Sequence, residues 1–182
     1  MFFRKPAKKE NEFTTQYELL EEHQQSNGLC APLANLAAKA TITNIPMETN
    51  SDKLYVLAVE EENHQVELSD AGKDGLHSAF IDLNIAYKTS DLPLENKFPS
   101  QFEELLDNSE YALITYPTKR NDKHMVFFNR NIDNTCSFFD ANKLGGRITG
   151  PCPNVVAYMK ESISSELPSQ PSPQDRIRLA KT

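Results

Sequence analysis

The sequence predicts a single α+β domain in which N-terminal helices pack on a small antiparallel sheet. Apolar residues in the first half recur at helical spacing, whereas the second half contains three β-rich runs separated by polar turns. Helices followed by sequential strands are typical of α+β proteins. The expected domain covers residues 13–167, between a disordered N-terminus (1–12) and a flexible Pro/Ser-rich tail (168–182).

The first two helices are predicted from their start signals. Residues 13–23 are predicted as a helix with Thr14 or Thr15 as its cap, and Glu18 follows Thr15 at the spacing of a capping box. After the turn-forming QQSNG, the run LCAPLANLAAKA carries Leu and Ala at helical spacing. Pro32 fits a helix only in its first turn, so this helix begins at about residues 29–31. The sequence therefore places Cys30 at a helix N-terminus.

The remaining elements follow in order along the chain. Residues 51–63 are predicted as a helix, although their LYVLAV segment also fits a strand. The other predicted elements are helices at 73–87, 99–107 and 154–166, the last capped by Asn154, strands at 111–117, 124–130 and 136–142, and a Gly/Pro-rich loop at 143–153. We expect the three strands to form a meander, with its second turn near residues 131–134.

Composition narrows the classes of function. The net charge of −7 disfavours a nucleic-acid partner and mildly favours a basic protein partner. No apolar run approaches the ~20 residues that span a bilayer, and the N-terminal MFFRKPAKKE lacks the apolar segment of a Sec signal. We therefore expect a monomer without a membrane span that is made in the cytosol and, if exported, leaves by another route.

The cysteine content predicts neither a disulfide framework nor a metal site. The three cysteines are an odd number without CxxC spacing, and the four histidines do not cluster with them. Cys136 and Cys152 are each expected to be small buried apolar residues. No cofactor is expected.

Cys30, His124 and Asp140 are the candidate catalytic residues. A cysteine acts as a nucleophile in its thiolate form, which a helix N-terminus and a nearby imidazolium stabilise. His124 begins one predicted strand, and Asp140 lies near the end of the next. Their positions are symmetric about residue 132 in the predicted turn, so we expect them to be cross-strand partners. Asp140 can then hold the imidazole and set its tautomer, as the third member of a triad does.

Each candidate also has a purely structural explanation. Cys30 could be a buried helix residue, His124 a surface residue at a strand end, and Asp140 a turn-capping residue with Asn142. An oxyanion hole needs donors aimed at the developing charge, and the Cys30 N–H is one predicted donor. Gln24 is the predicted side-chain donor, with the adjacent Gln25 as its alternative.

Three segments, NGLCAPLANL, HMVFFNR and FFDANKLGG, resemble the papain-like cysteine peptidase superfamily. The resemblance is closest to its bacterial effector branch, the YopT/AvrPphB-like peptidases and the OspI-type glutamine deamidases. It implies a papain-like fold with Cys30 as nucleophile, His124 as general base and acid, and Asp140 as the orienting residue. Gln24 would match the oxyanion glutamine of papain by its offset. The chain lacks tryptophan and has Asp140 in place of Asn, which points away from the secreted and lysosomal peptidases.

The resemblance implies a cysteine hydrolase that attacks an amide of a host protein after translocation by a type III or type IV system. A peptide bond as the target makes the enzyme a protease, and a glutamine side chain makes it a deamidase. The alternative is a non-catalytic adaptor that binds its partner through its acidic face or its tail. That tail, PSQPSPQDRIRLAKT, loosely resembles the C-terminal signals of type IV secreted effectors.

Overall fold

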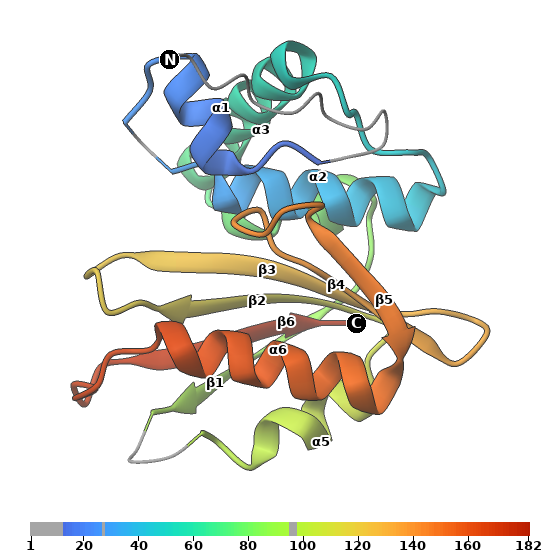
Figure 1. The fold of residues 1–182 in the computed structure, drawn as a ribbon, viewed down its shortest axis with the longest axis vertical. Coiled ribbons are helices and arrows are strands. Elements are labelled where there is room, and N and C mark those ends of the chain that lie inside the picture. The colour runs from blue at the N-terminus through green and yellow to red at the C-terminus, as the bar shows by residue number, and fades with distance from the viewer. Residues whose placement is uncertain (1–12, 27, 95–97) are drawn as a thin grey trace, which may run out of the picture.

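One antiparallel sheet lies between two layers of helices in the computed structural model, which describes residues 13–26, 28–94 and 98–182 (Figure 1). The predicted disorder of residues 1–12 falls outside these described residues. The helices are α1 (Gln16–Glu22), α2 (Cys30–Thr43), α3 (Ser51–Asp70), the 3-10 turn η1 (Gly75–His77), α4 (Ser78–Asp82), α5 (Gln101–Asp107) and α6 (Cys152–Glu166). The strands are β1 (Lys88–Pro93), β2 (Tyr111–Pro117), β3 (Lys123–Arg130), β4 (Thr135–Phe139), β5 (Arg147–Pro151) and β6 (Arg176–Lys181).

The strand order of this sheet is β1-β6-β2-β3-β4-β5, and all neighbouring strands are antiparallel. The three strands of the predicted meander are β2, β3 and β4, which are neighbours in this sheet. Helices α1 to α4 cover one face of the sheet, and α5 and α6 cover the other (Figure 1). The predicted α+β class, with N-terminal helices on an antiparallel sheet, is therefore confirmed.

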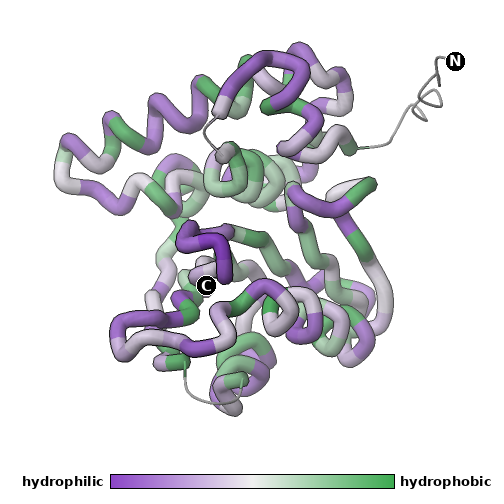
Figure 2. The backbone as a smooth tube through the Cα atoms, turned by 60° about the vertical axis from the view of Figure 1, so that its left-hand side comes forward, coloured by the Kyte–Doolittle hydropathy of each residue, from purple (hydrophilic) through white to green (hydrophobic). Residues whose placement is uncertain are grey.

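Each face of the sheet has its own apolar core, because successive strand residues point to opposite faces. On one face Leu113 and Phe127 pack against α2, whose Ala34, Ala37 and Ala38 are fully buried. These small side chains let the helix approach the sheet closely. Figure 2 shows hydrophobic residues concentrated in α2 and the central strands, whereas hydrophilic and hydrophobic residues alternate along α3. α2 is thus held firmly over β3.

The C-terminal segment is a central strand, so the prediction of a flexible tail at 168–182 is wrong. β6 lies between β1 and β2, and its Ile177 and Leu179 are fully buried. The signal was the alternation of apolar and basic residues in RIRLAK, which is the pattern of a strand. The Pro/Ser-rich residues before it obscured that pattern. The folded domain therefore extends to Lys181.

Cys136 and Cys152 form a disulfide, which corrects the prediction that they are separate buried thiols. Cys136 begins the buried part of β4, and Cys152 begins α6 directly after β5. The register pairs Cys136 with Gly150, so the hairpin brings the two cysteines together, with their Cα atoms 4.7 Å apart. The β5 sequence RITGP contains Gly and Pro and predicts a loop, so no local pattern places the two cysteines side by side.

Smaller differences concern the middle of the chain. α3 is a helix, as predicted, but it runs to Asp70 and is capped by the Asn50 side chain, which accepts from the Lys53 N–H at 3.0 Å. The segment predicted as one helix at 73–87 contains only η1 and α4, because Asn84 takes a positive φ of 54° that ends the helix. The unpredicted β1 follows it.

Candidate active site

Cys30 is the first residue of α2, as predicted from Pro32. The first N–H groups of a helix have no partner within the helix, and they carry the positive end of its dipole. Of the three cysteines, all of which the structure describes, Cys30 is the free one. Its sulfur is half-buried and lies 3.8 Å from the carbonyl oxygen of Lys123, the residue before His124. The thiol therefore sits where the start of α2 meets the start of β3.

His124 and Asp140 form a buried pair beside this thiol. The His124 Nε2 lies 2.7 Å from the Asp140 Oδ1, and their side chains are only 4% and 1% exposed. The same oxygen of Asp140 accepts the backbone N–H of Asn142 at 2.9 Å, which fixes the carboxylate in the loop after β4. Because Nε2 is engaged by Asp140, the ring nitrogen left to interact with Cys30 is Nδ1.

The surroundings of His124 favour its protonated form. Burial alone lowers its pKa, but the hydrogen bonds and charges of Asp140 and Cys30 outweigh burial and raise the pKa to about 10. An imidazolium held between a carboxylate and a sulfur stabilises the thiolate form of that sulfur. The buried His124–Asp140 pair therefore presents a positive charge to the half-buried sulfur at the floor of the site.

Tyr116 supports the imidazole from the neighbouring strand. It is the register partner of His124, and the two rings meet edge to face with their centroids 5.6 Å apart. The Tyr116 hydroxyl donates to the Glu166 carboxylate at 2.7 Å. Burial, followed by the charges of Asp140 and Glu166, raises the pKa of Tyr116, so its hydroxyl stays protonated. Tyr116 thus gives the imidazole an uncharged aromatic ring to pack against.

Gln16 is a site residue that the sequence analysis missed. Its Oε1 accepts the backbone N–H of Leu29 at 2.9 Å, its Nε2 donates to the Asn142 side chain, and its backbone N–H bonds to Ala141. It therefore joins α1, the start of α2 and the loop of Asp140. No spacing rule singled out Gln16, because it is the first residue of α1 and lies 14 positions before Cys30. Only the folded chain shows the two residues together.

Gln24 is placed differently from its predicted role. It follows α1 in a turn with a φ of 53°, its side chain is exposed, and it is absent from the residues that line the cleft around Cys30. Gln25 is also absent from that lining, and its side chain accepts the Tyr55 hydroxyl instead. Of the nearby glutamines, only Gln16 faces the site.

The loop of Asp140 is held in place by a close contact at Gly146. The Asp140 N–H donates to the Gly146 carbonyl at 2.8 Å and closes the loop. Gly146 has a φ of 69°, and a Cβ there would lie 2.7 Å from Phe13 and 2.9 Å from Phe139. These two rings pack edge to face, with centroids 5.1 Å apart. Because Phe13 lies just before α1, the contact also ties this loop to the segment that carries Gln16.

The three candidate residues meet although the predicted register was shifted by one position. The observed ladder pairs Phe127 with Phe139 and Arg130 with Cys136, which centres the turn on residue 133 instead of 132. The ladder ends before His124, and Asp140 reaches the imidazole from the loop beyond it. Asn142, which an extended ladder would place opposite His124, lies 3.5 Å from its Nε2.

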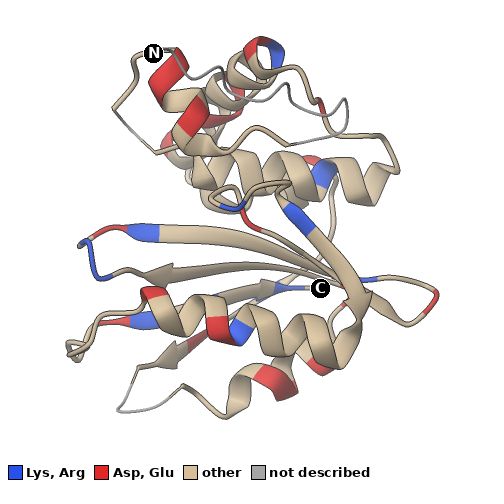
Figure 3. Cartoon of the chain, viewed as in Figure 1, with Lys and Arg blue, Asp and Glu red and all other residues tan. Residues whose placement is uncertain are grey.

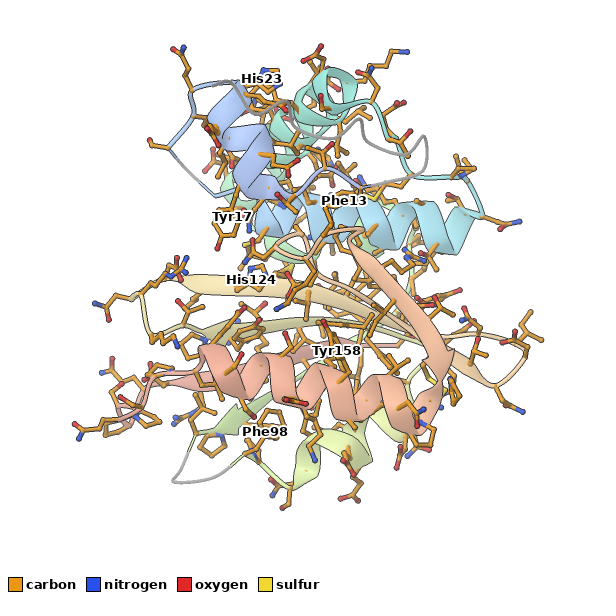
Figure 4. The ribbon with its side chains drawn as sticks, viewed as in Figure 1. Phe13, Tyr17, His23, Phe98, His124 and Tyr158 are labelled. Carbon is orange, nitrogen blue, oxygen red and sulfur yellow. A yellow bond between two sulfur atoms is a disulfide. The ribbon has the colours of Figure 1, made fainter. Side chains whose placement is uncertain are left out.

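A cleft of about 400 Å³ opens over Cys30 and His124. Figure 4 shows Tyr17 projecting from α1 toward the end of β3 where His124 lies. The helical side of the cleft is formed by Gln16, Tyr17, Leu20, Ser26, Gly28 and Cys30, and the sheet side by Thr118, Lys119, Arg120, Asp122, Lys123, His124, Asn142 and Glu166. A segment of polypeptide can therefore reach the thiol between α1 and the β2–β3 turn.

Within the described residues, no group of three or more His, Cys, Asp or Glu side chains is arranged to hold a metal ion. In the same part of the chain, no helix has the length and apolar character needed to cross a membrane.

The α+β fold with a cysteine at the start of a buried helix is the papain-like fold that the resemblance implied. Among solved structures, the chain is similar to the Pseudomonas avirulence protein AvrPphB, with a TM-score of 0.57 and 7% sequence identity. The match covers 84% of this chain and 89% of that one. No protein-family model matches the sequence, and no curated protein matches it. The likeness is therefore one of fold.

Proposed function

We propose that this protein is a cysteine hydrolase that attacks an amide of a host protein, with Cys30, His124 and Asp140 as its triad. The observation that carries the proposal is the buried 2.7 Å bond between His124 and Asp140, in the cleft that also holds the Cys30 thiol. A structural cysteine needs neither a charged histidine nor an open cleft beside it.

The reaction begins with attack by the Cys30 thiolate on the amide carbonyl carbon, which forms a C–S bond and an oxyanion. The Cys30 N–H at the start of α2 and the Gln16 amide are the proposed donors to that negative charge. His124 then gives its proton to the departing nitrogen, the C–N bond breaks, and a thioester remains. Water, deprotonated by His124, hydrolyses the thioester and restores the thiol.

The Gln16 Nε2 carries two N–H groups, and Asn142 accepts only one of them, so the second is the proposed donor to the substrate oxygen. The Oε1 of the same amide accepts the Leu29 N–H, which fixes the plane of the amide at the cleft. Leu29 immediately precedes the nucleophile, and therefore the bond also fixes the backbone from which the Cys30 N–H points. We assign to Gln16 the role that the sequence predicted for Gln24.

The fold of an avirulence protein supports a role as a bacterial effector that is translocated into a host cell. In this proposal the substrate is a host protein, and the site needs no metal or cofactor. Attack on a backbone amide releases a new amino terminus, whereas attack on a glutamine side chain releases ammonia. The triad performs either reaction, and the substrate's fit in the cleft decides between them.

The products of the reaction test the proposal. Host-cell proteins are incubated with the wild-type protein or with Cys30→Ala, and their intact masses are compared. We expect new fragments if the target is a peptide bond, or a mass gain of about one dalton if it is a glutamine. Either change must be absent with Cys30→Ala. If Cys30→Ala retains every effect of the wild type in host cells, the protein is a non-catalytic adaptor and the proposal fails.

A further inference from the structure

The rim of the cleft is basic although the protein as a whole is acidic. Lys119, Arg120 and Lys123 line the sheet side of the cleft and are exposed; we call them the basic rim. The chain has a net charge of −7, so three cations beside the thiol have the opposite sign to the charge of the whole protein. Figure 3 shows these blue segments at the β2–β3 turn, the end of the sheet where the cleft opens.

The β2–β3 turn holds the basic rim in a fixed position. The Thr118 N–H donates to the Asp122 carbonyl at 2.9 Å, and Asn121 takes the positive φ of 62° that a tight turn requires. The Lys119 N–H donates to the carbonyl of Glu166, at the end of α6, at 2.8 Å. The turn is therefore anchored both within itself and to a helix. A fixed backbone lowers the entropy cost of engaging a ligand.

The two acidic residues of the cleft are engaged by hydroxyl groups of the protein, whereas the basic rim has no carboxylate partner among the described residues. The Asp122 carboxylate accepts the Thr118 hydroxyl, and the Glu166 carboxylate accepts the Tyr116 hydroxyl. Arg120 donates to the Tyr17 hydroxyl at 3.1 Å, across the mouth of the cleft. Lys119 and Lys123 form no ion pair with a described residue. Lys119 and Lys123 can therefore pair with a ligand, although the charge of Lys123 also acts on the nearby Asp91 carboxylate.

The basic surface continues from the cleft along the sheet. Lys123 also lines a second hollow of about 180 Å³, whose other cations are Arg176 and Arg178 of β6. Arg178 is neutralised by two hydrogen bonds to Asp91, at 2.7 and 3.0 Å. Arg176 bonds only to backbone carbonyls of its own turn, those of Pro173 and Asp175. Asp91 and Asp175 also line this hollow, and after the Arg178 hydrogen bonds the charges of Arg176 and Lys123 help to lower the pKa of Asp91, so this part of the surface is only weakly basic.

We propose that the substrate of this enzyme is an acidic polypeptide segment, with Asp or Glu side chains flanking the attacked amide and paired with Lys119, Arg120 and Lys123. The inference rests on the proposed function, since that function brings a polypeptide to Cys30. The net charge of −7 and the two carboxylates in the cleft disfavour a continuous chain of phosphates, whereas a peptide can present a few acidic side chains at the cations alone. The net charge alone favours a basic partner, whereas the cations of the cleft favour an acidic one.

Two peptide chloromethyl ketones that differ only in carrying two Glu or two Lys residues test the charge preference. We measure the second-order rate at which each alkylates Cys30. The wild type is expected to react roughly tenfold faster with the Glu probe, and the ratio is expected to fall as salt is added. For each variant we compare the ratio of the rates with the Glu and Lys probes, because a change in the reactivity of the thiol alters both rates equally and cancels in the ratio.

Variants locate the preference in the basic rim. Lys119→Glu with Lys123→Glu is expected to invert the ratio, and the milder Lys119→Gln with Lys123→Gln to bring it near one. Lys73→Glu, an exposed charge reversal outside the cleft, must keep the wild-type ratio. A wild-type ratio near or below one overturns the inference. Protection of Cys30 by a single-stranded oligonucleotide but not by polyglutamate also overturns it, in favour of a nucleic-acid ligand.

A separate reagent keeps this inference distinct from the proposed function. Iodoacetamide is small and uncharged, so its reaction with Cys30 reports the activation of the thiol by His124 and not the charge of the rim. If the His124→Gln variant reacts as fast as the wild type, the proposed triad fails. If Cys30 reacts faster with iodoacetamide in the wild type than in His124→Gln, but the two peptide probes react at equal rates, only the acidic-substrate inference fails.

Discussion

The His124 imidazole has three neighbours: Asp140 binds its Nε2, the Tyr116 ring meets it edge to face, and Cys30 lies at its remaining nitrogen. Asp140 was found from the sequence because the hairpin brings the end of β4 back toward the start of β3. The sequence does not assign Tyr116 or Gln16 to the site, because only the second hairpin has a predicted turn centre and Gln16 belongs to a separate helix.

The raised pKa of His124 predicts how stability depends on pH. Because the folded protein holds the imidazole proton up to a pKa of about 10, against an ordinary value of 6.5, the stabilisation is complete below pH 6.5. It is lost as the pH rises from there to about 10. Below about pH 8.5 the proton that a folded Cys30 thiolate lacks offsets the one that His124 keeps, so the free energy from urea unfolding should fall mainly above that pH. His124→Gln and Asp140→Asn should each flatten that slope, and an unchanged slope in both would contradict the ion pair.

Replacing Gln16 tests the proposed oxyanion hole. A peptide aldehyde forms a hemithioacetal whose oxygen would occupy that hole, so Gln16→Ala should weaken its binding by at least about tenfold. Gln24→Ala is the matched control, because its side chain is exposed outside the cleft. The inhibition constant of the aldehyde distinguishes the two glutamines. A loss in Gln24→Ala with none in Gln16→Ala would restore the original prediction.

At the scale of the elements, the sequence predicts the features that depend on neighbouring residues, such as helix starts, helix caps and the bounds of a hairpin strand. Pro32 located the start of α2 to within a residue, and Thr15 caps α1, its side chain accepting the Glu18 N–H as the capping box predicts. Strand β2 has the predicted bounds of 111–117. The strands that were missed are β1, β5 and β6, which lie at the two sheet edges or come from a distant part of the chain. Their pairing depends on contacts that no local pattern contains.

β6 should be required for folding. It contributes Leu179, which is fully buried between the sheet and the helices of one face, so Leu179→Ala should cost about 2–5 kcal/mol of unfolding free energy. Arg176→Ala, at an exposed position of the same strand, should cost much less. Urea denaturation measures both. If Leu179→Ala were as stable as Arg176→Ala, the segment would be the flexible tail that the sequence analysis expected.

At the scale of the whole molecule, the site joins two layers that have separate cores. The helical layer supplies Cys30 and Gln16, and the sheet supplies His124 and the loop of Asp140. The disulfide lies at the opposite end of β3 and β4 from His124, since Cys136 pairs with Arg130 in the ladder. It therefore fastens α6 to the sheet without contacting the site.

Removing the disulfide should lower stability and spare the site. The bridge links residues 16 positions apart, and a closed loop of that size is worth about 3 kcal/mol by the loop-entropy relation. Cys136→Ala with Cys152→Ala should therefore unfold at lower urea concentration, while Cys30 reacts with iodoacetamide at the wild-type rate. A large loss of Cys30 reactivity in the folded variant would show that the disulfide supports the catalytic geometry.

The rate at which iodoacetamide alkylates Cys30 near neutral pH tests the central claim most directly. Labelling is mapped to Cys30 by peptide mass analysis, in the wild type, His124→Ala and Asp140→Asn, with folding checked by circular dichroism. If His124 holds the thiol as a thiolate, the wild type should react roughly tenfold or more faster than His124→Ala, with Asp140→Asn between them. Equal rates in the wild type and a folded His124→Ala would show that Cys30 is not activated, and would contradict the triad.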